Sequence, residues 1–256
     1  MHAWTKSGNP LEHPSPWGRY GVFSTIRVLP GHKILFKDQH LQRIRQHADK
    51  LALPWVPSLE ELNTRVEKYA KDLPADRDHL LRACLFEDCL GLSARLAQSD
   101  GNPVEGWLLE YRRPEPTIKC TAEKDLYGKL VELEIEREDW IIMDPKDQEL
   151  RETATSNLIF ATDKNLLIPE KKILHGITLQ NLMPYLKKDF TISTVIPNDQ
   201  NILEFDEILL CGTGRGIAPL EKIPELGWSK KSDDNFSKIR ALYEKMISSP
   251  NACLSL

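Results

Sequence analysis

A polar segment with two closely spaced prolines, 112–116, divides the chain near its middle. Proline fixes its own φ, lacks a backbone N–H and drives the preceding residue toward extended conformations, so a helix or a central strand cannot continue through this segment. The segment therefore predicts a linker between two domains. We expect a small N-terminal α+β domain at 1–111 and a larger C-terminal α/β domain at 117–256, each long enough to bury its own core.

The N-terminal half has the pattern of antiparallel strands with two helices. Residues 20–28 mix aromatic and β-branched residues and predict a strand, and a short returning strand is expected at 34–36. The apolar residues of 41–51 fall on one face of a helix that Asp38 could cap. A second helix is expected after Ser58, because Ser58 and Glu61 have the spacing of a capping box.

Strand and helix patterns alternate in the rest of the chain. Strands are expected at 79–86 and 107–111, on either side of a loop that carries Arg95. The elements expected beyond the linker are a helix at 126–133, strands at 140–143 and 153–162, a helix at 177–186, a strand at 207–211 and a helix at 236–246. Both halves are thus α+β in character.

Composition and charge exclude several classes of protein. The net charge is -4 and the basic residues are spread along the chain, so no footprint for nucleic acid or anionic lipid is visible. Apolar runs are too short to span a membrane, and with no secretory signal visible at the start we expect a cytoplasmic protein. Five cysteines without a Cys-x-x-Cys pair argue against a disulfide framework and a zinc site. His40 and His47 lack a third ligand at metal spacing, so no metal site is expected.

Three segments carry residues suited to chemistry. Residues 151–160 place a carboxylate before three hydroxyl residues and an asparagine, at the start of an apolar strand. His175-Gly176-Ile177-Thr178 opens a helix, where free backbone N–H groups can hold a phosphate. Residues 210–220 form a glycine-rich turn with one hydroxyl and one cation. Taken singly, these segments are also typical of a polar strand start, an ordinary helix start and a tight turn.

Together and in this order, the three segments resemble the class IV aminotransferases, the fold type IV family of pyridoxal-phosphate enzymes. That family includes branched-chain and D-amino acid aminotransferases and aminodeoxychorismate lyase. Residues 20–28 are similar to its glycine-aromatic strand, and 40–44 to its His-x-x-Arg helix. The resemblance covers 20–220 with gaps. It implies a two-domain α+β fold, pyridoxal 5'-phosphate as cofactor, a small amino acid-like substrate and a homodimer.

The resemblance implies a cofactor lysine ahead of the glutamate that faces the pyridine nitrogen. Lys119 lies 33 residues before Glu152 and directly after the proline linker. Lys124 and Lys129 are nearby alternatives, but they fall within a helical pattern where a solvated lysine is ordinary. Partial burial beside Ile118 would favour the deprotonated amine that a Schiff base requires. Lys119 is therefore the expected catalytic and cofactor-binding lysine, with Glu152 keeping the ring nitrogen protonated.

The remaining site residues are also implied by the resemblance. The residues expected to bind the cofactor besides Lys119 and Glu152 are Arg43, Ile177, Thr178, Thr213 and Asn157. Candidates for the substrate carboxylate are Arg82 and Arg95, with Arg215 as a weaker third. Arg82 could equally be a structural partner of Glu87 or Asp88. Phe23, Ser24 and Gly214 are expected to line the substrate pocket.

One departure from the family and the residue at position 24 bear on the fold and on the reaction. The stretch between the strand ending near Tyr111 and Lys119 is shorter than in the family, so the fold is expected to be shortened at the domain junction. Ser24 follows Phe23 where the aminotransferases often carry glutamate and the lyase a small hydroxyl residue. The sequence therefore favours an aminodeoxychorismate lyase, which forms 4-aminobenzoate and pyruvate. An amino acid transaminase and a non-catalytic family member are the alternatives.

Overall fold

The computed structural model describes residues 1–12, 19–97, 100–194 and 196–253. By its internal contacts the chain forms two compact units. The first consists of Met1–Ala97, Ile118–Lys124 and Ser249–Leu256, and the second of Gln98–Thr117 and Asp125–Ser248. This division differs from the domain boundaries expected at 111 and 117. In particular, Lys119 belongs to the first unit, because the segment Ile118–Lys124 is assigned to that unit by its contacts.

The first unit is built on a six-stranded antiparallel sheet with the strand order β2-β1-β6-β5-β3-β4. Its strands are β1 (His2–Thr5), β2 (Pro10–Leu11), β3 (Gly21–Leu29), β4 (Lys33–Ile34), β5 (His79–Phe86) and β6 (Cys89–Leu96). In the long central pair, Gly21 lies opposite Phe86 and Val28 opposite His79. The strands expected at 20–28 and 79–86 are therefore confirmed, and the structure places them side by side. Arg95, expected in a loop, lies instead in β6.

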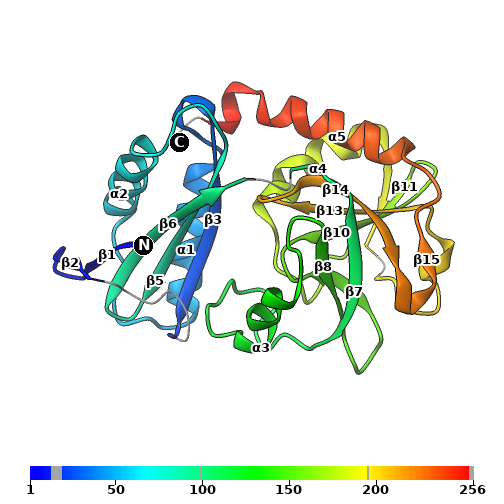
Figure 1. Cartoon of the computed structure of the whole chain (residues 1–256), viewed down its shortest axis with the longest axis horizontal. Coiled ribbons are helices and arrows are strands. Elements are labelled where there is room, and N and C mark those ends of the chain that lie inside the picture. The colour runs from blue at the N-terminus through cyan, green and yellow to red at the C-terminus, as the bar shows by residue number, and fades with distance from the viewer. Residues whose placement is uncertain (13–18, 98–99, 195, 254–256) are drawn as a thin grey trace. The chain divides into compact units, whose positions relative to one another are not determined.

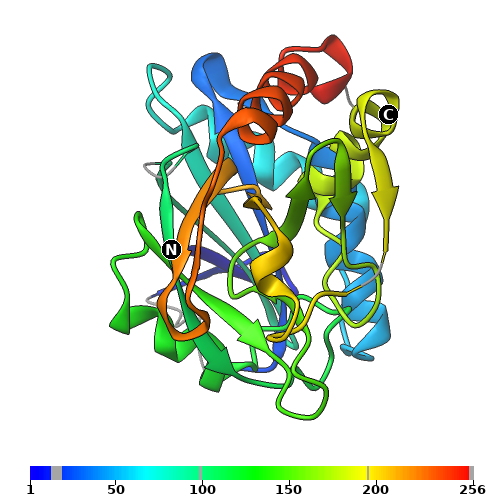
Figure 2. The same ribbon diagram turned by 90° about the vertical axis from the view of Figure 1, so that its right-hand side faces the viewer.

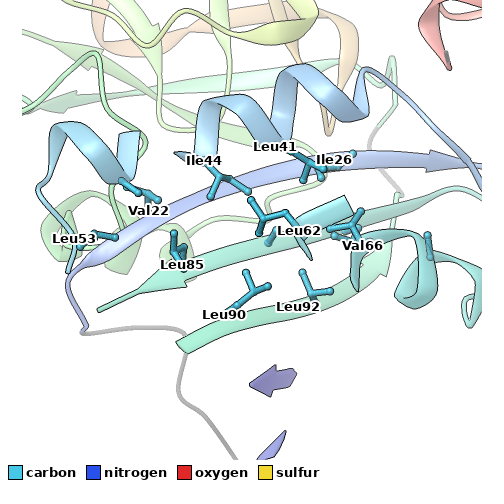
Figure 3. Packing of buried hydrophobic residues seen from close by; sticks show 14 of the residues in the cluster. Val22, Ile26, Leu41, Ile44, Leu53, Leu62, Val66, Leu85, Leu90 and Leu92 are labelled. Atoms are coloured by element: carbon cyan, nitrogen blue, oxygen red, sulfur yellow. The ribbon is translucent and has the colours of Figure 1, made fainter. Parts of the chain in front are cut away.

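Helices α1 (Lys37–Lys50) and α2 (Leu59–Lys71) contribute to the core of the first unit (Figure 3). Leu41 and Ile44 of α1 and Leu62 of α2 are fully buried with residues of the sheet. The Ser58 hydroxyl accepts the Glu61 backbone N–H at 3.0 Å, which confirms the expected capping interaction. Helix α1 does not use Asp38 as its cap and begins at Lys37, after Phe36 in a left-handed conformation.

The second unit is a sheet that closes on itself. The nine-stranded order is β12-β11-β10-β13-β14-β7-β8-β9, with β15 on β14, and β9 pairs again with β10. The strands are β7 (Val104–Glu110), β8 (Glu138–Met143), β9 (Leu150–Thr153), β10 (Asn157–Thr162), β11 (Asn165–Leu167), β12 (Thr191–Ser193), β13 (Glu207–Gly212), β14 (Gly216–Ile223) and β15 (Trp228–Ser229). The strand expected at 153–162 is thus two strands, separated by a tight turn at 154–156. Asn157 lies opposite Glu152 at the point of closure.

Helices α4 (Ile177–Asp189) and α5 (Asp234–Ile247) lie against each other and against β13 (Figures 1 and 2). Both helices were expected from the sequence. The helix expected at 126–133 is instead the short α3 (Lys124–Tyr127) followed by a 3-10 turn at Gly128–Glu132. Phe160, Leu210 and Trp228 belong to the buried core of this unit. No helix in the described part of the chain is both long and apolar enough to cross a membrane.

Candidate functional site

The backbone of Lys119 is hydrogen-bonded to strand β3 and to a histidine side chain of helix α1. Its carbonyl accepts the Phe23 N–H at 3.1 Å, and its own N–H donates to Nδ1 of His47 at 3.0 Å. The neighbours Ile118 and Cys120 are buried in the core of the first unit. The Lys119 amine lies 4.8 Å from the centroid of the Phe23 ring. A half-buried lysine is thus fixed at both of its peptide groups, with its amine beside an aromatic face.

Arg43 is oriented by Ser24. The guanidinium donates to the Ser24 hydroxyl at 2.6 Å, and that hydroxyl lies 2.7 Å from Nδ1 of His40. Because arginine only donates, the serine proton can point at His40, which then accepts at Nδ1 and carries its hydrogen on Nε2. Burial, and after it the nearby Arg43 and Lys119 cations, hold the pKa of His40 well below its ordinary value. The histidine is neutral, as this chain of bonds requires.

The two substrate-arginine candidates have different surroundings. Arg82 on β5 places its guanidinium carbon 4.0 Å from the centroid of the Phe23 ring. The same ring therefore contacts both Arg82 and Lys119, an arrangement in which the aromatic face stabilises positive charge. Asp88, one of the expected structural partners of Arg82, pairs with Arg19. Arg95 is exposed on β6 and donates to the adjacent Leu96 carbonyl at 3.3 Å.

Glu152 lies in a buried strand of the second unit and is held by two donors. Arg113 donates to its Oε1 at 2.7 Å, and the Leu174 backbone N–H donates to its Oε2 at 3.2 Å. The side chains of Arg113 and Glu152 are 6% and 7% exposed, so the two opposite charges form an ion pair that is shielded from bulk water. Arg113 also donates to the Pro116 carbonyl at 3.1 Å. The carboxylate is therefore fixed in direction, and a carboxylate oxygen can accept more than one hydrogen bond.

Glu152 and Arg113 form part of the wall of a pocket in the second unit. The pocket has a volume of about 160 Å³. Its lining residues are mostly charged: Tyr111, Arg112, Arg113, Pro116, Ile142, Asp144, Glu149, Arg151, Glu152 and Lys172. Asp144 accepts hydrogen bonds from Arg112 and Arg151, and the bond with Arg112 is the main cause that lowers the pKa of Asp144 far below its ordinary value. The acids of this wall are thus paired with arginines.

Asn157 connects the turn before helix α4 to strand β10. Its amide nitrogen donates to the Leu174 carbonyl at 2.8 Å, and its amide oxygen accepts the Gly176 N–H at 3.1 Å. A Cβ at position 176 would lie 2.2 Å from that oxygen, so only glycine fits. The first N–H groups of α4, at Ile177 and Thr178, have no partner within the helix, and its first turn contains no acidic residue. This helix start can accept an anion.

The expected glycine-rich turn is a hairpin between β13 and β14. Gly212 lies opposite Gly216, and Thr213 and Gly214 are half-buried at the tip between them. Arg215, by contrast, points inward: it is 3% exposed and donates to the carbonyls of Ile135 and Glu138 at 2.7 and 2.6 Å. Arg215 therefore braces the turn and leaves Thr213 and Gly214 as its accessible residues.

The sequence does not predict two residues that bind the expected site residues, Arg113 beside Glu152 and His47 beside Lys119. Arg113 falls in the expected linker, where no local sequence signal indicates its buried partner Glu152. His47 is considered in the sequence only as a metal ligand. Its position four residues after Arg43, on the same face of a helix, was the available signal.

The chain matches the model of the family described as amino-transferase class IV over residues 21–223. The chain belongs to this family, and the expected family, fold, enzyme class and pyridoxal-phosphate cofactor are confirmed. No curated protein sequence matches the chain significantly.

Solved structures share the fold at low sequence identity. A branched-chain aminotransferase from Thermoproteus uzoniensis, solved with norvaline, is 17% identical, with 98% of this chain and 97% of that chain covered and a TM-score of 0.82. The PLP-bound form of a hypothetical aminotransferase from Mycobacterium tuberculosis is 19% identical over 97% and 99% of the chains, with a TM-score of 0.77. A putative 4-amino-4-deoxychorismate lyase from Legionella pneumophila is 17% identical over 88% and 91%, with a TM-score of 0.75.

The residues described above fit pyridoxal phosphate by their chemistry. The first unit supplies a half-buried amine at Lys119 and a buried guanidinium at Arg43. The second supplies the fixed carboxylate of Glu152 and a helix start at Gly176 that a Cβ would fill. The groups of the first unit suit an aldehyde and a phosphate, and those of the second suit a protonated pyridine nitrogen and a phosphate.

Proposed function

We propose that the chain is a pyridoxal-phosphate-dependent lyase, with Lys119 as its cofactor lysine, that converts 4-amino-4-deoxychorismate to 4-aminobenzoate and pyruvate. The observation that carries the assignment of the lysine is the Phe23 ring, whose centroid lies 4.8 Å from the Lys119 amine and 4.0 Å from the Arg82 guanidinium. A substrate that reacts at the lysine can direct a carboxylate toward Arg82. A small molecule that carries both an amine and a carboxylate is the chemical class that this pair accepts.

Glu152 and Lys119 would have separate roles in the reaction. When bound, pyridoxal phosphate supplies an electron sink that stabilises negative charge on the substrate carbon. Glu152, held by Arg113, accepts the hydrogen bond of the pyridine nitrogen and keeps its proton in place. Lys119, after its release, would take the proton from the substrate carbon and deliver a proton to the methylene carbon of the leaving enolpyruvate. The elimination breaks the bond to the enolpyruvyl oxygen, so that pyruvate leaves and the ring becomes aromatic.

Phosphate binding would use charges that are already oriented. Arg43 is fixed by Ser24, so it loses little side-chain freedom when it pairs with a phosphate. The N–H groups of Ile177 and Thr178 and the hydroxyl of Thr213 would add further donors. Asn157 would act on the phosphate through the helix start that it holds.

Ser24 supports the lyase over the transaminase. Its side chain is fully buried and its hydroxyl is engaged by Arg43 and His40, so this position adds no carboxylate to the site. Many aminotransferases of the family carry a glutamate there. A transaminase would share the cofactor contacts but would need a pocket that accepts two different acids in turn.

The absorption spectrum tests the cofactor assignment. Wild-type protein incubated with pyridoxal phosphate should turn yellow, and Lys119→Ala should lose that absorbance because no amine remains at this position. Lys124→Ala is the matched control, since Lys124 is exposed nearby on α3 and should leave the colour unchanged. Full absorbance in Lys119→Ala, or its loss in Lys124→Ala, would show that the wrong lysine was chosen.

Product analysis tests the reaction. The loaded enzyme should release 4-aminobenzoate and pyruvate in equal amounts from 4-amino-4-deoxychorismate, without a second substrate. Transfer of an amino group from an amino acid to an oxo acid, with neither product formed, would replace the lyase with a transaminase. A protein that binds the cofactor and performs neither reaction would be a non-catalytic member of the family.

We also propose a homodimer, which is the assembly that the family resemblance implies. Light scattering after size-exclusion chromatography should give twice the mass of the 29.3 kDa chain. A monomeric mass at micromolar concentration would contradict this proposal and would leave the lysine assignment unaffected.

A further inference from the structure

His47 makes a contact that the proposed function does not use. Its ring lies on helix α1 and is 7% exposed. Nδ1 accepts the backbone N–H of Lys119 at 3.0 Å, although the two residues are far apart in the sequence. A buried side chain therefore reaches the peptide group of the residue that is proposed to hold the cofactor.

The hydrogen bond completes the backbone contacts of Lys119. Its carbonyl is taken by the Phe23 N–H on one side, and its N–H by His47 on the other. Lys119 lies outside regular secondary structure, joined to β3 through the isolated bridge between Val22 and Cys120. In such a segment a side chain must replace the partner strand that would otherwise satisfy the N–H. Without His47, the Lys119 peptide group could rotate.

Helix α1 also places Arg43. Positions 40, 43 and 47 follow the spacing of one helix face, and all three side chains are buried. One rigid element thus fixes the arginine proposed for the phosphate and the backbone of the lysine proposed for the cofactor carbonyl. Their separation is then set by helix geometry and does not depend on a mobile loop.

We infer that His47 is a positioning residue that fixes the backbone of Lys119 and thereby keeps its amine beside the Phe23 ring. The inference rests on the proposed role of Lys119. His47 acts through Lys119 and touches neither substrate nor cofactor. Its Nδ1 must accept, so the ring carries its hydrogen on Nε2 while the bond exists.

Two substitutions separate this role from simple packing. His47→Leu fills a similar volume but cannot accept a hydrogen bond. His47→Asn is smaller but keeps an acceptor, Oδ1, near the position of Nδ1. A residue that only fills space should be replaced better by leucine, whereas a positioning residue should be replaced better by asparagine.

The first measurement uses the protein without cofactor. Hydrogen exchange of the Lys119 amide should become about tenfold faster in His47→Leu and should return toward the wild-type rate in His47→Asn, since one hydrogen bond is lost and then restored. The nitrogen spectrum of the His47 ring should show a hydrogen on Nε2 only. A hydrogen on Nδ1, or equal exchange in all three proteins, would overturn the inference.

The second measurement uses the loaded enzyme. In His47→Leu the pH midpoint of the cofactor absorbance should shift by about half a unit or more, because the displaced amine no longer lies beside the Phe23 ring. The kcat should fall about tenfold with KM within about twofold, and His47→Asn should recover most of both changes. An unchanged midpoint in His47→Leu would refute the positioning role. Absence of absorbance in the wild type would instead overturn the proposed function, and the role of His47 with it.

Discussion

At the scale of single residues, the ion pair of Arg113 and Glu152 should affect both the stability of the fold and the binding of the cofactor. Both side chains are buried and their hydrogen bond is 2.7 Å long. We predict that Arg113→Met lowers the free energy of unfolding by about 3 kcal/mol, because a buried carboxylate loses its cation. Urea unfolding measures this change. Affinity for pyridoxal phosphate should fall as well, since the carboxylate loses the donor that orients it.

The double variant provides the control for this pair. In Arg113→Met/Glu152→Gln neither member of the buried ion pair remains, and the amide oxygen introduced at position 152 can still accept the Leu174 N–H. The double variant should therefore be more stable than Arg113→Met alone, with a coupling of about 1 kcal/mol or more. If the loss in the double variant equalled the sum of the losses in Arg113→Met and Glu152→Gln, the two charges would not interact.

His40 gives the molecule a pH dependence of defined sign. Burial, then Arg43 and Lys119, hold the pKa of His40 well below the value of about 6.5 that it has when unfolded. Below that pH the unfolded chain binds a proton that the folded chain does not. The contribution of His40 to the free energy of unfolding is therefore fully present above about pH 6.5. It is lost as the pH falls, by up to about 1.4 kcal/mol per pH unit.

Urea unfolding between about pH 5 and 8 checks this prediction, with His40→Asn as the comparison. Asparagine keeps an acceptor for Ser24 but does not titrate, so the variant should lose part of the slope below about pH 6.5. Parallel pH profiles for the two proteins would show that His40 is protonated alike in the folded and unfolded chains.

At the scale of secondary-structure elements, the start of helix α4 depends on Gly176. A Cβ there would lie 2.2 Å from the Asn157 Oδ1, closer than the two atoms can approach. We predict that Gly176→Ala costs about 1–3 kcal/mol of stability through this overlap. It should also weaken the affinity for pyridoxal phosphate, because the first turn of α4 is displaced. Gly128→Ala is the control, since a Cβ at 128 meets no atom within 4 Å.

Elements with strong local signals could be predicted from the sequence, and those that depend on pairing could not. The spacing of Ser58 and Glu61 predicts the N-terminal cap of helix α2, and in the structure the Glu61 N–H donates to the Ser58 hydroxyl. Strand β6 contains Arg95, which is expected in a loop, and its pairing with β5 is what makes it a strand. The strand expected at 153–162 is broken by a turn in which two backbone N–H groups donate to the Thr153 hydroxyl.

The same distinction holds for the site across the whole molecule. Lys119, Glu152 and Arg43 could be chosen because their order and spacing resemble the family. The partners that orient them are His47, Arg113 and Ser24, and these lie 72, 39 and 19 residues away from the groups they contact. Contacts over such separations follow from the fold, and one sequence carries no local pattern for them.

Ligand linkage provides a prediction for the whole chain. A cofactor that binds only the folded protein adds a stabilisation that grows with its concentration, about 2.7 kcal/mol at about 100 times the Kd. Pyridoxal phosphate should therefore raise the free energy of unfolding, and the increase should be smaller in Lys119→Ala, which keeps the phosphate donors but cannot form the covalent bond. Inorganic phosphate should stabilise wild type and Lys119→Ala equally. If pyridoxal phosphate stabilised both proteins to the same extent, its binding would depend on the phosphate alone and Lys119 would have no part in it.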